Sequence, residues 1–179
     1  MANIHAVVRT DRMFGTDNRA GLISIKYIVS DSSSGTAVDV ETAIENGNVL
    51  KSTSLIEGER EVFKGVAPAA DDDVKDIVLV ASPELMYDER KHNLDDFTNE
   101  AGKIARAYRL HSGDIFSVTK EALDGAATPA VGDVVELKAG TKLNVKAAAT
   151  GATSGSTVIG EIIAIDVVGK YTYYVILVD

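Results

Sequence analysis

The side chains in this chain that could bind a metal ion are a few histidines and a run of aspartates. Three histidines share no ligand spacing: His5, His92 and His111. A metal site would need the fold to bring them together with carboxylates. The aspartates at 71–73 and 76 could hold a hard cation, but a calcium loop needs alternating ligands around a glycine turn, and this run lacks that pattern. We expect no metal and no cofactor, and we interpret the run as a solvated loop.

The residue types used in nucleophilic and acid–base catalysis are present, but without the spacing that catalysis requires. Ser154 and Ser156 lie in a small-residue loop, and the chain has no Gly-x-Ser-x-Gly elbow. A phosphate-binding Gly-x-x-x-x-Gly-Lys-Ser/Thr loop is also absent, as is a Gly-x-Gly-x-x-Gly turn. Asp95 and Asp96 could act as an acid–base pair only inside a pocket, and nothing in the sequence predicts one. We therefore expect no catalytic residues and no enzymatic activity.

Composition excludes several classes of partner. The 179 residues carry a formal net charge of -9, without a long Lys/Arg run, so nucleic acid is not an expected partner. Cysteine is absent, which excludes disulfides and thiolate sites. No apolar run approaches the roughly 20 residues that span a bilayer. The first residues lack an export-signal pattern, and we expect no membrane partner.

Two charged segments with aromatic anchors are candidate protein-contact regions. Arginine and aromatic side chains are favoured at interfaces because they combine large contact area with forked hydrogen-bond donors. The candidate contact residues of the first segment are Arg9, Arg12, Phe14 and Arg19. This segment is equally well interpreted as an exposed loop between two strands. The second segment spaces its anchors through charge, as a docking segment does; its candidates are Tyr87, Arg90 and Phe97.

Three tyrosines close to the C-terminus could form a stacking or sugar-binding platform. On one strand, Tyr171 and Tyr173 would share a face and Tyr174 would take the other. Aromatic side chains in strands pack mostly against cross-strand neighbours. We therefore predict that these tyrosines pack in the core.

Turn residues divide the chain into short runs with β propensity. Strands are expected at 4–9, 22–29, 38–44, 49–55, 61–66, 76–81, 104–110 and 114–119. Asn46-Gly47 predicts a hairpin between two of these runs. Two more hairpins are expected, over 136–146 and 158–179, and Gly-Asp precedes a strand at both 113 and 132. Ser82-Pro83 could begin a short helix, residues 120–125 a single helical turn, and 147–157 a flexible loop.

These elements predict a mainly β protein made of short-stranded β-barrel or sandwich modules, with at most one or two short helices. We expect an N-terminal β-rich module over residues 1–100, with an irregular connecting segment at 82–103. A small barrel-like module is expected over 104–179. The chain would then be a rigid β scaffold.

The sequence resembles small virion proteins of tailed bacteriophages. The resemblance is carried by residues 87–103 and 105–119, including Gly113-Asp114-Ile115-Phe116, and by the opening at 8–17. The most similar type is the capsid (head) decoration, or cement, protein, which shares the β-rich character, the Gly-Asp strand entries and the lack of cysteine.

The resemblance implies a non-enzymatic protein that binds the outer capsid surface across subunit junctions and stabilises the shell. Its partner would be the major capsid protein. The resemblance is compatible with either a homotrimer or a monomer as the oligomeric state. It would be found on the virion, and in the host cytoplasm during assembly. Two alternatives remain: a phage tail or head–tail component, and a ligand- or carbohydrate-binding β module.

Overall fold

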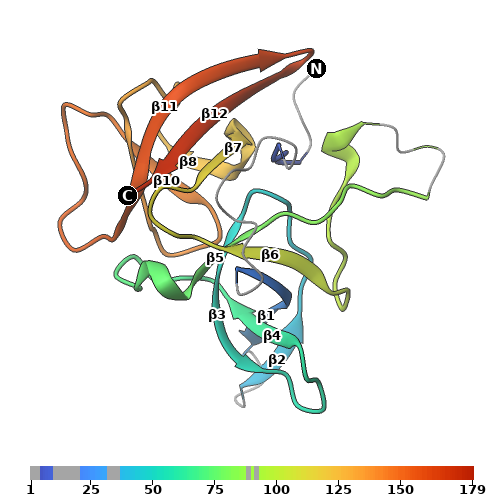
Figure 1. Ribbon diagram of the computed structural model, residues 1–179. Coiled ribbons are helices and arrows are strands. Elements are labelled where there is room, and N and C mark those ends of the chain that lie inside the picture. Colours follow the sequence, from blue (N-terminus) through green and yellow to red (C-terminus); the bar gives the residue numbers. More distant parts are fainter. Residues whose placement is uncertain (1–4, 10–20, 32–36, 88–89, 91–92) are drawn as a thin grey trace.

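The first half of the chain forms a closed barrel with one strand added to its side. A computed structural model describes residues 5–9, 21–31, 37–87, 90 and 93–179 (Figure 1). The barrel strands pair in the ring β1-β4-β3-β5-β6, and β6 closes it by pairing with β1. Only β1 and β4 run parallel within it, and β2 pairs with the far end of β1. The bounds are β1 (Leu22–Asp31), β2 (Val38–Glu41), β3 (Val49–Leu55), β4 (Val62–Val66), β5 (Ile77–Val80) and β6 (Ala105–Arg109).

The second half forms an open, curved sheet. Its order is β7-β12-β11-β9-β10-β8, and its longest pair is the antiparallel β11–β12 hairpin, drawn at the top of Figure 1. The bounds are β7 (Ile115–Thr119), β8 (Leu123–Gly125), β9 (Val134–Glu136), β10 (Leu143–Lys146), β11 (Val158–Val168) and β12 (Tyr171–Val178). Single 3₁₀ turns connect strands: η2 (Val74–Asp76), η3 (Leu94–Asp96) and η4 (Lys120–Ala122). The predicted mainly β fold of short-stranded barrel modules is confirmed.

The two Gly-Asp strand entries form the same turn. Gly113 and Gly132 both adopt φ of 88°, a left-handed conformation that costs glycine little. The aspartate that follows accepts a hydrogen bond from the backbone N–H three residues earlier, at 3.0 Å for Asp114 and 2.9 Å for Asp133. Each aspartate thereby satisfies a backbone donor as the chain enters β7 or β9.

Four local predictions are wrong. Residues 5–9 contain a single bridge residue, Val8, in place of the strand expected at 4–9, and residues 123–125 form β8 where a helical turn was expected. The other two fail for reasons that involve distant residues. The chain does turn at Gly47, with φ of 83°, but the runs on either side are not paired, since β2 pairs with β1 and β3 with β4 and β5. No helix begins at Ser82. Its hydroxyl accepts a hydrogen bond from the Arg106 backbone N–H at 2.9 Å instead of capping a helix.

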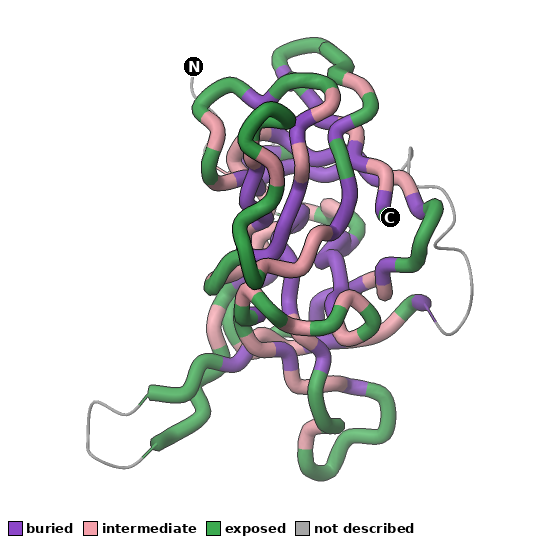
Figure 2. The backbone as a smooth tube through the Cα atoms, turned by 90° about the vertical axis from the view of Figure 1, so that its left-hand side faces the viewer, coloured by how far each residue is buried: buried purple, intermediate pink, exposed green. Residues whose placement is uncertain are grey.

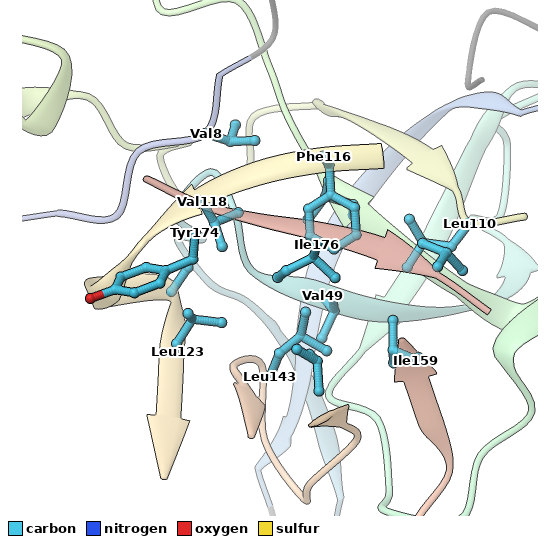
Figure 3. Close-up of a cluster of buried hydrophobic side chains, with 14 of the residues drawn as sticks. Val8, Val49, Leu110, Phe116, Val118, Leu123, Leu143, Ile159, Tyr174 and Ile176 are labelled. Carbon is cyan, nitrogen blue, oxygen red and sulfur yellow. The ribbon is translucent and has the colours of Figure 1, made fainter. Parts of the chain in front are cut away.

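The core has one cluster inside the barrel and a larger one between barrel and sheet. β5 is buried on both faces: Val78 and Val80 point into the barrel, while Ile77 and Leu79 pack on the second sheet. A continuous apolar run is the pattern expected of a strand buried on both faces. Figure 3 shows Val49 among Phe116, Leu143 and Ile176 of the second sheet, and in Figure 2 the buried segments run through both halves.

The boundary expected between residues 103 and 104 does not coincide with the change of sheet. β6, which follows it, completes the first barrel by pairing with β1 and β5. At the other end of the chain, Ala6 and Val8 pack in the cluster shared with the second sheet, and Val8 forms a β-bridge with Val118. The change of sheet lies between β6 and β7.

Candidate functional site

A groove of about 680 Å³ lies on the barrel where the irregular segment after β5 passes the start of β6. We call it the 82–106 groove. Its walls come from three stretches: 82–87, 96–100 and 103–106, with Ser24 from β1. The first two stretches are irregular, and the third enters β6 at Ala105.

Buried amide side chains hold these walls in place. Asn46, with 1% of its surface exposed, donates from Nδ2 to the Ser82 carbonyl at 2.8 Å and accepts from the Ser82 N–H at 2.9 Å. Asn99 donates to Asn46 Oδ1 and to the Ile44 carbonyl, both at 3.1 Å. Because buried polar groups are costly to leave unpaired, this network holds the groove walls in place at Ser82 and Asn99.

The rim of the groove exposes apolar side chains beside charged ones. Leu85 is 68% exposed, Tyr87 94% and Ile104 52%. Lys103 and Arg106 line the groove from one stretch, and Asp96 and Glu100 line it from another. An exposed aromatic beside apolar side chains and charges of both signs matches the anatomy of a protein-docking surface.

A partly buried ion pair ties the segment beside the groove to the tip of the β11–β12 hairpin. Asp95, 5% exposed, accepts from Lys170 Nζ at 2.9 Å and from the Tyr171 hydroxyl at 2.8 Å. Burial alone would raise the pKa of Asp95, but these two hydrogen bonds outweigh it and hold the pKa below its usual value. The pKa of Tyr171 is raised, by burial first and by the bond to Asp95 second.

The structure brings some of the predicted contact residues together and separates others. Tyr87 and Phe97 both line the 82–106 groove, whereas Arg90 is exposed and does not line it. Arg9 lies in a neighbouring hollow of about 420 Å³ with Leu94, Lys170 and Tyr171. Its guanidinium carbon is 5.5 Å from the centre of the Tyr173 ring. Three predicted residues lie outside the described residues: Arg12, Phe14 and Arg19.

Several of the residues first considered for metal binding have structural partners. His5 Nδ1 lies 2.8 Å from Glu45, and His111 Nδ1 lies 3.7 Å from Asp114, while His92 is outside the described residues. Asp72 pairs with Lys51, and Asp73 caps η2. Within the described ranges, no three His, Asp or Glu side chains gather in a way that could hold a metal ion.

The C-terminal tyrosines pack as predicted. Tyr171 and Tyr173 form a small cluster with Val7, and their ring centres are 6.0 Å apart. Tyr174 points to the opposite face and into the main core. All three are buried, so they present no flat aromatic platform to a sugar.

Sequence reasoning missed a buried carboxylate in the second sheet. Glu136, 1% exposed, accepts from Asn144 Nδ2 at 2.7 Å, from the Thr153 N–H at 2.6 Å and from the Thr153 hydroxyl at 2.7 Å. Burial would raise its pKa, but these hydrogen bonds lower it below the usual value. They also fix the 147–157 loop, which we expected to be flexible. The one available signal was a lone carboxylate within the apolar run 134–137.

The fold and the groove together define a β scaffold with a preformed surface groove. Comparisons with protein-family models, with curated proteins and with solved structures find no match to the chain. In the part of the chain that is described, no helix has the length and apolar character needed to cross a membrane.

Proposed function

We propose that this protein is a non-enzymatic structural protein of a tailed-bacteriophage virion that binds the outer capsid surface across subunit junctions. The observation that carries the proposal is Tyr87, 94% exposed at the rim of a groove whose walls are fixed by the Asn46–Asn99 network. A decoration protein needs such a rigid surface, because each residue that is ordered only on binding reduces the affinity.

The mechanism is mechanical. The protein contacts neighbouring major capsid subunits through Tyr87, Leu85 and Ile104, and the buried interface opposes expansion or rupture of the shell. Burying apolar surface contributes about 25 cal/mol per Å² before the cost of association. The same contact repeats over the lattice, so a modest affinity at each site is sufficient. The same groove could be the contact surface of a tail or head–tail component. All of its lining residues come from one chain, so the groove does not depend on trimer formation.

A ligand-binding β module is the second candidate. The groove volume of about 680 Å³ falls within the range of small-molecule sites. Carbohydrate is the less suitable ligand, because a sugar-binding platform needs more than one exposed aromatic ring. Tyr87 is exposed, but Phe97 is only partly exposed and the C-terminal tyrosines are buried.

The test adds purified protein to particles assembled from the neighbouring capsid gene and images them. Ordered density on the outer shell is expected for the wild-type chain, and Tyr87→Ser should lower occupancy about tenfold or more, as truncation of an aromatic anchor does. Val131→Ser is the matched control, because Val131 is 60% exposed and does not line the groove. Absence of density with wild-type protein would exclude the decoration role, and saturable binding of a sugar or metabolite in the groove would favour the second candidate.

A further inference from the structure

β11 is longer than the strand that covers its outer edge. β12 pairs along it as far as Val168, whereas β9 pairs only from Val158 to Glu161. The last backbone bonds on the β9 side involve Ile162, whose N–H donates to the Asp133 carbonyl at 3.0 Å and whose carbonyl accepts from the Gly132 N–H at 2.7 Å. A bulge follows between Ile162 and Ala164. Among the described residues, no strand pairs with the outer edge of residues 163–168.

Five of the six side chains at 163–168 are apolar, and Asp166 is the one charged side chain among them. Ile165 lies opposite Tyr174, which points to the core, and Val167 continues that row; they are 39% and 73% exposed. Asp166 lies opposite Tyr173 on the other face and is exposed. It forms no ion pair with a described residue. Six residues whose outer edge has no strand partner span about 20 Å, which is the length of a typical strand.

We propose that residues 163–168 of β11 bind an extended, apolar segment of a second protein that carries a basic residue facing Asp166. Such a segment would complete the open backbone hydrogen bonds, place its apolar side chains over Ile165 and Val167, and place a cation beside Asp166. The proposal goes beyond the capsid-binding role, because it concerns the second sheet and holds whichever particle the groove binds.

A second copy of the chain is the less suitable occupant. Edge-to-edge pairing would bring the Asp166 carboxylates of both copies to one shared edge, and like charges brought together across a strand pair are destabilising. The formal net charge of -9 opposes self-association further. A charge placed on an exposed apolar edge is a common means of preventing self-pairing. A negative charge leaves the edge open to a basic strand.

The test uses a short fluorescein-labelled peptide of alternating lysine and valine, with binding followed by fluorescence anisotropy. Wild-type protein should bind it, and added salt should weaken binding because the charged contacts are exposed. Asp166→Lys and Val167→Lys should each weaken binding about tenfold, as expected when cross-strand contacts are lost and like charges are introduced. Val38→Lys is the matched control, since Val38 is an exposed valine, at 53%, in β2 of the other sheet. Val167→Lys should melt near the wild-type temperature, because the side chain is mostly solvated.

Backbone readouts make the test specific for strand addition. Bound peptide should slow amide hydrogen exchange within residues 163–168, and a peptide with alternate amides N-methylated should bind at least tenfold more weakly. Unchanged exchange in 163–168, or equal binding by the N-methylated peptide or by a glutamate–valine peptide, would overturn the proposal. A concentration-dependent dimer that Val167→Lys abolishes would also overturn it, by assigning the edge to a second copy.

Discussion

Single buried carboxylates determine how this protein responds to acid. Glu136 bonds to Thr153 and Asn144 in its charged form, and its pKa in the folded state lies below its unfolded value. Its contribution is therefore fully present above the unfolded pKa of about 4.3, and it is lost as pH falls through the folded pKa. Thermal melts at decreasing pH should show this loss below about pH 4.

Substitution of the same residue isolates its share of the pH dependence. Glu136→Gln should destabilise the protein at neutral pH by about 1–3 kcal/mol, because a charge-assisted acceptor is replaced and one amide group is left poorly paired. The melting temperature of the variant should also fall less steeply with acid. Glu161→Gln, at an exposed carboxylate in β11, is the control and should follow the wild-type curve. An unchanged pH slope in Glu136→Gln would contradict the assignment.

The Asp95 contact predicts a measurable coupling between residues far apart in sequence. Asp95→Asn should cost about 1–3 kcal/mol, since it removes the charge facing Lys170 and weakens the bond to Tyr171. Tyr171→Phe should cost about 0.5–1.5 kcal/mol. Chemical denaturation of both single variants and the double variant should give a non-additive sum, because they share one hydrogen bond. Strict additivity would show that the bond is not formed in solution.

At the scale of elements, two glycines in strands differ in how much an added Cβ atom should destabilise the protein. A Cβ on Gly160 of β11 would lie 1.8 Å from the Leu177 carbonyl oxygen of β12, a backbone atom that cannot move without breaking the pair. A Cβ on Gly65 of β4 would meet side-chain atoms of Ile25 and Leu50 at 2.7 to 2.9 Å, and these can shift. Gly65→Ala should therefore cost about 1–3 kcal/mol, as overpacking does. Gly160→Ala should cost clearly more by urea denaturation; an equal or smaller loss would contradict this geometry.

The positions of the strands follow from local sequence, but their partners do not. Residues 49–55 are the strand that β propensity and flanking turns predict, and β4, β5, β6 and β7 begin and end within a residue or two of expectation. The parallel pairing of β1 with β4 joins residues about forty apart, and no local pattern encodes it. The wrong hairpin at Asn46-Gly47 shares this cause, because Asn46 bonds to Ser82 and Asn99.

The candidate site was also predictable only in part. Tyr87 and Phe97 were identifiable as bulky anchors within a charged stretch, and both line the groove. The groove itself was not predictable, because its walls depend on buried amides contributed from Ile44–Asn46 and from 82 and 99. The sequence does not distinguish a solvated polar residue from one that is buried in a hydrogen-bond network.

At the scale of the whole molecule, the shared core predicts that barrel and sheet unfold together. Val49, Ile77 and Leu79 lie on the outer face of the barrel and are fully buried against the second sheet. The barrel has its own inner cluster, but without the second sheet this outer apolar face would be exposed to water. One transition with equal calorimetric and van't Hoff enthalpies is expected.

Leu79→Ala tests that coupling, because Leu79 belongs to the barrel strand β5 while its side chain packs in the shared cluster. The cavity should cost about 2–5 kcal/mol. In native-state hydrogen exchange, the most protected amides of β7 and β12 should lose the same protection as those of β3, since all would exchange through one global opening. Leu85→Ala is the control, because this leucine is 68% exposed and should leave both sets unchanged. If β3 lost protection while β7 and β12 kept theirs, the second sheet would be stable alone, and the surface shared by the two sheets would be an interface between two separately folding units.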